Sequence, residues 1–163
     1  MANEFINGRK SLLFLDTVTP ITTPLDEVTP ENFKMVACLT NNGFDGTTSA
    51  IATTSKCSGS FAESLDGEKG WTMSGEGNAI DIEVGDERIS HNALFKQWRS
   101  GAAAWWAIMD ADLLNASATL RYGVGRIDSQ GDAFPDNDAQ TFTISITGIG
   151  EPGDQDDMAP ITT

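Results

Sequence analysis

Side chains able to carry out acid–base or nucleophilic catalysis are few in this chain. His91 is its sole histidine, and no motif around it supplies the orienting carboxylate and nucleophile that a general base needs. We expect it in the first turn of a helix, where the dipole disfavours an imidazolium ion. Ser58, Ser60 and Ser74 lie among glycines, but none has the G-x-S-x-G context of a hydrolase nucleophile. The sequence therefore predicts no catalytic centre based on histidine or serine.

The carboxylates and thiols give no stronger signal. Asp136 and Asp138 have the spacing of an acid pair or of calcium ligands, but the Gly and closing Glu of an EF-hand loop are missing. We interpret them as solvated loop acids and keep an acid-pair hydrolase as a minor alternative. Cys38 and Cys57 form no CxxC motif, which disfavours a metal or redox site. We expect both to be free thiols buried in strands, with a disulfide between them left open. The chain is thus predicted to be no enzyme and to bind no cofactor or metal.

Four tryptophans are the remaining candidates for contact with a ligand. Most are expected in the core, and Trp98 lies on the apolar stripe of a predicted helix. Trp105 and Trp106 are neighbours, so in a strand they point to opposite faces of the sheet. One of them is expected to face outward, where an indole ring stacks well on a sugar. This expectation supports an alternative function, a carbohydrate-binding or adhesin-type β-sandwich module.

The segment TFTISITGIG near the C-terminus alternates apolar and polar residues with the period of a strand. Phe142, Ile144 and Ile146 form the face that is expected to pack on a core. The opposite face is a stripe of uncharged hydroxyls: Thr141, Thr143, Ser145 and Thr147. Its neutrality needs an explanation, because the chain has 24 acidic and only 10 basic residues.

Seven or so strands and one helix are expected to position these residues. The helix has Ser90 as its N-cap, continues through HNALFKQWRS and ends before Gly101. Strands are expected at 10–16, 34–44, 50–64, 70–84, 103–111, 117–127 and 140–150. The dipeptides and tripeptides that indicate turns between them are Asn41-Asn42-Gly43, Asp45-Gly46 and Asp66-Gly67. The predicted fold is mainly β, an antiparallel β-sandwich or barrel with one flanking α-helix.

The strands leave two polar segments within a single domain spanning residues 1–163. Residues 17–31 are rich in Thr and Pro, and Pro20, Pro24 and Pro30 exclude a central strand. We expect an extended loop or projecting arm there. Residues 151–163 form an acidic C-terminal arm that we expect to be mobile in the isolated chain.

The formal net charge of −14 bears on the partners that the chain can bind. An acidic surface repels phosphates, so binding of DNA or RNA through the backbone is strongly disfavoured. The apolar run at 12–15 is too short for a signal peptide, and no segment approaches the length of a membrane span. We therefore expect the chain to be made and kept in a cytoplasm.

The order of these segments resembles one known family. SKCSGSFAESLDGEKGWTMSGEG, then a helix, a Trp-containing strand, an acidic Pro-containing loop and TFTISITGIGEP are similar to the major tail tube proteins of long, non-contractile-tailed phages. The similarity covers residues 10–152. It implies a β-sandwich subunit that forms hexameric rings, in which strands of neighbouring subunits join into one barrel. Rings would stack into a tube through which DNA passes. Related tube proteins occur in contractile tails and in type VI secretion, so the resemblance does not decide to which of these machines the chain belongs.

The resemblance also implies partners and surfaces. The chain would be a homo-oligomer that meets tape measure, tail-tip and tail-terminator proteins, in the virion tail and, during assembly, in the host cytoplasm. The helix would lie outside the lumen wall. The candidate assembly interface consists of Thr19, Pro20, Pro24, Thr141, Thr143, Ser145 and Thr147. The hydroxyl stripe would either line the lumen, past which DNA slides, or pack against a neighbouring subunit through Thr–Thr pairs.

Overall fold

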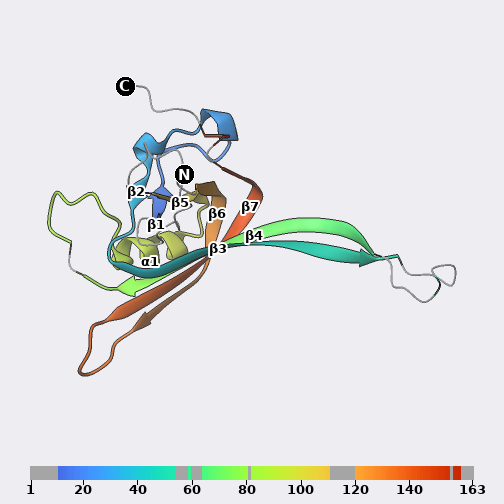
Figure 1. Cartoon of the computed structure of the whole chain (residues 1–163). Coiled ribbons are helices and arrows are strands. Elements are labelled where there is room, and N and C mark those ends of the chain that lie inside the picture. Colours follow the sequence, from blue (N-terminus) through green and yellow to red (C-terminus); the bar gives the residue numbers. More distant parts are fainter. Residues whose placement is uncertain are drawn as a thin grey trace, which may run out of the picture.

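The computed structural model describes residues 11–53, 59, 64–80, 82–110, 120–154 and 156–158 (Figure 1). The predicted fold class, mainly β and antiparallel with one helix, is confirmed. The strands are β1 (Ser11–Asp16), β2 (Lys34–Met35), β3 (Leu39–Ala52), β4 (Ser64–Asn78), β5 (Ala104–Asp110), β6 (Arg121–Ala133) and β7 (Thr141–Gly153). The helices are α1 (His91–Ser100) and two 3₁₀ turns, η2 (Leu25–Glu27) and η3 (Pro30–Asn32).

The seven strands of the described residues belong to one sheet in the order β2-β1-β5-β6-β7-β4-β3. The sheet curls, so that β1, near one edge, approaches the other edge across the core. Leu13 of β1 and Leu39 of the edge strand β3 both lie next to Gly75 of β4. A Cβ atom on Gly75 would be 3.1 Å from Leu13 Cδ2 and 3.4 Å from Leu39 Cδ2. The two edge strands are not hydrogen-bonded to each other, so the curled sheet is open.

The sheet buries side chains on both of its faces. Inside the curl, Trp106, Phe142 and Ile146 pack with Leu94 of α1. On the opposite face, Trp105 and Tyr122 pack beneath the segment that follows β1. The prediction that one of the two adjacent tryptophans faces outward is therefore wrong. Trp105 and Trp106 do point to opposite faces, but they are only 2% and 0% exposed because both faces are covered there.

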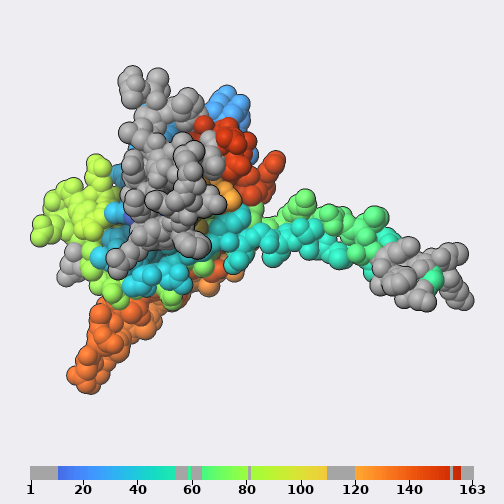
Figure 2. Space-filling view, in the orientation of Figure 1, coloured from blue at the N-terminus to red at the C-terminus, as the bar shows by residue number. Residues whose placement is uncertain are grey.

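Two hairpins project from the body in different directions (Figures 1 and 2). We call the outer part of the β3–β4 hairpin, residues 47–52 and 64–70, the β3–β4 arm, and we call the end of the β6–β7 hairpin, residues 131–139, the β6–β7 tip. The turns predicted at 41–43, 45–46 and 66–67 are wrong, because all of them lie inside β3 or β4. Glycine and asparagine occur here within an exposed, twisted ribbon rather than at its turns. Part of the predicted acidic loop likewise continues β6 to Ala133.

The predicted helix is confirmed in its bounds and its caps. The Ser90 side chain accepts a hydrogen bond from the backbone N–H of Ala93, and Gly101 adopts the left-handed conformation just past the end. Of its expected apolar stripe, however, only Leu94 is buried. Phe95 and Trp98 are 38% and 41% exposed, so the expectation that Trp98 is a core residue is wrong.

The Thr/Pro-rich segment 17–31 folds onto the body and is not a projecting arm. Val28 is fully buried, Pro30 is buried, and the two 3₁₀ turns lie in this segment or at its end. Cys38 is exposed in a turn with φ of 55° and is not a buried strand residue, while Cys57 lies outside the described residues. Of the predicted C-terminal arm, residues 151–153 continue β7, and 155 and 159–163 lie outside the described residues.

Candidate assembly surface

The hydroxyl stripe lies on the polar face of β7, opposite the core. Phe142, Ile144 and Ile146 are buried as predicted, whereas Thr143 and Thr147 are exposed. Thr141 and Ser145 are half-buried. The polar face is therefore accessible in the single chain, and the structure brings the four predicted hydroxyl residues together on it.

Small polar residues continue this face on the neighbouring strands. Ser145 lies opposite Ser74 of β4 on one side and opposite Ser129 of β6 on the other. Thr147 lies between Thr72 and Arg126 in the same way. The four strands β6, β7, β4 and β3 thus form a hydrophilic surface on which most side chains are neutral. We call this surface, formed by the outward side chains of 41–47, 72–78, 126–133 and 141–147, the polar face.

The few charges on the polar face are mainly acidic. Glu76 accepts a hydrogen bond from the side-chain amide of Asn41 at 3.2 Å, which fixes its carboxylate on the surface. Asp45 lies opposite Thr72 and is exposed. Arg126 is also exposed and supplies positive charge at one end. An acidic and hydroxyl-rich surface has little affinity for nucleic acid phosphates.

Both sides of this four-stranded region end in strand edges without a partner among the described residues. β3 is the last strand of the sheet and is 14 residues long. On the other side, β5 pairs with β6 only between Arg121 and Gly125, so residues 128–133 pair with β7 alone. Long unpaired edges of this kind invite pairing with another chain.

The remaining predicted interface residues lie in the segment after β1. Thr19 donates its hydroxyl to the carboxylate of Asp16, which is fully buried and also accepts the backbone N–H groups of Val18 and Thr19. The indole of Trp105 donates to the carbonyl oxygen of Pro20 at 3.0 Å. Pro20 and Pro24 keep exposed side chains. Thr19 thus has a structural role in the single chain, and the two prolines remain free to meet a neighbour.

Tyr122 anchors the same segment to the sheet. Its hydroxyl donates to the carbonyl oxygen of Leu25 at 2.6 Å, and its side chain is fully buried. Burial raises the pKa of Tyr122 to about 12, and the negative charges of Asp157, Asp154 and Asp26 add to the effect. The neutral hydroxyl is therefore built into the fold.

Alkaline titration tests this anchor, because Tyr122 is the sole tyrosine of the chain. The raised pKa means that the folded state keeps its proton while the unfolded chain loses it above its ordinary value of 10.0. Stability from this group should be complete below pH 10 and fall as the pH rises towards 12. The ultraviolet absorbance of tyrosinate should show one transition near pH 12 in the folded protein. A transition near pH 10 in a chain that is still folded would contradict the anchor.

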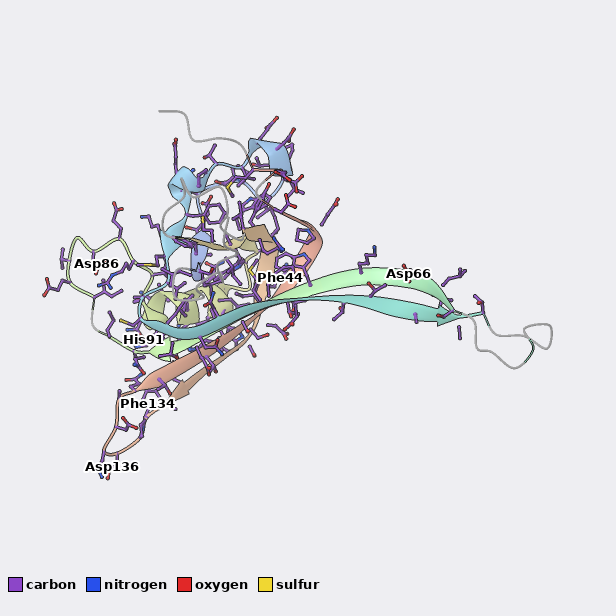
Figure 3. The ribbon with its side chains drawn as sticks, viewed as in Figure 1. Phe44, Asp66, Asp86, His91, Phe134 and Asp136 are labelled. Atoms are coloured by element: carbon purple, nitrogen blue, oxygen red, sulfur yellow. The ribbon has the colours of Figure 1, made fainter. Side chains whose placement is uncertain are left out.

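Around His91, Asp136 and Asp138 the described part of the chain forms no catalytic arrangement. Ser74 lies on the polar face, and Ser58 and Ser60 lie outside the described residues. His91 stacks on Phe142 with ring centroids 6.4 Å apart, and its Nδ1 atom is buried without a hydrogen-bond partner. Asp136 lies at the β6–β7 tip, far from the body (Figure 3), and Asp138 in the same turn accepts the backbone N–H of Ala139. Among the residues that the structure describes, no three His, Cys, Asp or Glu side chains are grouped to hold a metal ion. No helix in the described part of the chain is long and apolar enough to cross a membrane.

Three apolar features at or near the surface were not predicted from the sequence. Phe44 stacks on Trp71 at the root of the β3–β4 arm, beside a groove of about 520 Å³. Farther out, Ile51 and Leu65 face each other across the arm and are 55% and 62% exposed. The third feature is a set of exposed aromatic side chains at two separate places, Phe95 and Trp98 on α1 and Phe134 on the β6–β7 tip. In the sequence, these residues stand out only as large apolar residues outside the predicted core. Their exposure could not be predicted, because it depends on how far the hairpins extend from the body.

Comparison with solved structures relates this architecture to known assemblies. The chain aligns with a chain in the tail of an empty gene transfer agent particle, solved with C6 symmetry, at a TM-score of 0.66 and 16% identity, covering 91% of this chain and 98% of that one. It aligns with the SPP1 tail tube at a TM-score of 0.66 and 12% identity, covering 91% and 78%. The chain has a tail-tube fold. A third match is the six-fold symmetrised baseplate of the anti-feeding prophage, at a TM-score of 0.62 and 12% identity, covering 94% and 97%. No protein-family model and no curated protein sequence matches the chain.

Proposed function

We propose that this protein is a structural subunit of a phage tail tube, which self-assembles into stacked hexameric rings and forms the conduit for DNA ejection. The observation that carries the proposal is the four-stranded region β6-β7-β4-β3, which combines a free edge on each side with a mainly neutral polar face. The tail-tube fold supports the same conclusion, and the C6 symmetry of one similar assembly favours six subunits.

The two free edges account for ring formation. β3 of one subunit pairs with residues 128–133 of β6 in the next, so that each ring becomes one continuous barrel. Such a contact joins two different surfaces of the same molecule and closes when the rotation between subunits fits a ring. Closure removes the exposed edges of the single chain. The β3–β4 arm and the β6–β7 tip extend from the body in different directions (Figure 1). This offset between neighbouring hairpins is compatible with a barrel whose strands are tilted to its axis.

The polar face then becomes the wall of the channel. Thr143, Ser145 and Thr147 provide hydrated, uncharged groups past which DNA slides without specific binding. The acids Asp45 and Glu76 repel phosphates and so prevent DNA from adhering to the wall. The opposite face of the same strands cannot line the channel, because it packs against the core and α1.

The projecting parts account for stacking of the rings. The β3–β4 arm extends beyond the body and presents Ile51 and Leu65 as an exposed cross-strand pair on the side that continues the polar face. An exposed aliphatic pair on an arm without its own core favours contact with another subunit. The exposed Pro20 and Pro24 are proposed to join the same network of contacts.

The remaining assignments follow from this role. α1 lies outside the lumen wall, and the protein has a structural rather than a catalytic function. In the assembled virion tail it meets tape measure, tail-tip and tail-terminator proteins, and it assembles in the host cytoplasm. Burial of Trp105 and Trp106 leaves the carbohydrate-binding alternative without its stacking platform.

Electron microscopy of the purified chain tests the proposal. The expected particles are rings or tubes with six-fold symmetry, in which the polar face lines a channel. Monodisperse monomers at every concentration and salt condition, with tail-tip proteins present or absent, would contradict it.

A further inference from the structure

The β6–β7 tip carries an exposed aromatic ring among acids. Phe134 is 74% exposed and lies near the end of the projecting hairpin (Figure 3). The exposed Asp132, Asp136 and Asp138 surround it in sequence, and Pro135 follows it directly. A large apolar side chain held away from the body on a stiff turn costs free energy in water unless another surface covers it.

A surface of opposite charge lies on α1. Phe95 and Trp98 pack against each other with ring centroids 5.7 Å apart, and each exposes more than a third of its surface. The exposed cations Lys96 and Arg99 flank them. The helix carries no acidic residue, on a chain whose formal net charge is −14. We call Phe95, Lys96, Trp98 and Arg99 the α1 patch.

We propose that the β6–β7 tip of one subunit docks on the α1 patch of a second copy. Phe134 would lie against the Phe95–Trp98 pair, and the aspartates of the tip would pair with Lys96 and Arg99. Charge complementarity selects this occupant, because an aromatic flanked by acids matches aromatics flanked by bases. A second copy supplies the contact because the hairpin points away from the body that carries α1 (Figure 1).

The contact would link copies in one direction. Its two halves are different surfaces, so each subunit gives a tip to one neighbour and receives a tip from another, as in the rings and stacks proposed above. This inference deepens the proposed function and rests on it. It also gives Asp136 and Asp138 a role that needs no catalysis or metal.

Assembly measurements test the aromatic part of the contact. The Phe134→Ala chain should keep the circular dichroism of the parent, because the side chain is exposed, but should need at least about tenfold more protein to assemble, which corresponds to about 1.4 kcal/mol. Phe134→Leu, which keeps most of the apolar area, should show a smaller change. An unchanged assembly threshold for Phe134→Ala would overturn the proposal.

A charge exchange tests the polar part. Asp136→Lys with Asp138→Lys should weaken assembly, and so should Lys96→Glu with Arg99→Glu. A chain carrying all four changes restores opposite charges across the contact and should assemble at least about fivefold better than either half-exchanged chain, more so at low salt. A fourfold variant no better than its two halves would overturn the pairing.

Cross-linking locates the contact and separates its failure from that of the tube. In a Cys38→Ser, Cys57→Ser background, a chain with Asp136→Cys is mixed with one carrying Arg99→Cys. Mild oxidation of assembled protein should give mixed dimers, which should be rare when Glu31→Cys replaces Arg99→Cys. Tubes that form without mixed dimers would contradict the docking alone. A parent chain that never assembles would contradict both the docking and the proposed tube.

Discussion

Replacing Thr143 and Ser145 together with lysine should leave the single chain folded but prevent it from forming a working tube. Both side chains lie on the polar face, exposed or half-buried, so the ammonium groups can remain in water in the monomer. In a closed ring the new charges recur in every subunit and face one another across a channel. Like charges repeated around a ring repel, and any tube that still forms would hold DNA phosphates instead of releasing them.

The expected readouts are a melting temperature close to that of the parent and an assembly threshold raised by tenfold or more in low salt. Val84→Lys with Glu87→Gln is a matched control, since it raises the net charge by the same two units at exposed positions outside the polar face and the α1 patch. The control should assemble like the parent. A Thr143→Lys, Ser145→Lys chain that assembles and passes DNA normally would place the hydroxyl stripe on the outside of the tube.

Replacing Ile51 and Leu65 with aspartate should likewise abolish stacking while the body remains folded. The two residues are cross-strand partners on the β3–β4 arm and are more than half exposed, so their loss removes little from the core. At an interface between rings, a carboxylate in place of a buried aliphatic side chain typically costs about 2 kcal/mol or more per contact. Because the contact repeats in every ring, tubes should disappear at concentrations where the parent forms them.

The control for this change lies on the opposite face of the same arm. Ala52 and Ser64 are the next cross-strand pair, and Ala52→Asp with Ser64→Asp adds the same charge without removing the aliphatic pair. Sedimentation and negative-stain images should then distinguish the two faces. Equal loss of assembly in both variants would mean that added charge, and not burial of Ile51 and Leu65, is responsible.

Local patterns predicted one strand of the polar face, β7, and the helix α1. The alternation through Phe142, Ile144 and Ile146 gave β7 and its two faces, and Ser90 and Gly101 bounded α1. These features depend on neighbours within a few residues, where periodicity and capping act directly. The shared face of the hydroxyl residues on β7 could therefore be predicted from the sequence.

Features that depend on distant contacts were not predicted. Trp105 is buried because residues 20–33 cross over β5 and β6, and no local pattern in a Thr/Pro-rich segment reports that packing. The turn signals inside β3 failed for a related reason. A long hairpin outside the core has little apolar alternation, so Asn42 and Gly43 resemble turn residues although they pair with β4.

The exposure of the aromatic side chains on α1 and on the β6–β7 tip was also not predicted, because it depends on how these elements sit on the body. Leu94, Phe95 and Trp98 fit one helical stripe by spacing, but α1 contacts the body along a narrow line and buries only Leu94. The exposed position of Phe134 was not predicted, because the acidic segment around it was expected to be a loop. Part of that segment is instead the end of β6 in a projecting hairpin. The tertiary arrangement determines which surfaces remain exposed. The proposals on assembly are therefore based on the structure.

A cryo-electron microscopy reconstruction of the assembly formed by the purified full-length chain tests the central claim most directly. The account predicts a six-fold tube in which β3 of one subunit pairs with residues 128–133 of the next and Thr143, Ser145 and Thr147 face the channel. A chain that stays monomeric under all conditions, or a tube whose channel is lined by α1 or by residues 17–31, would contradict it.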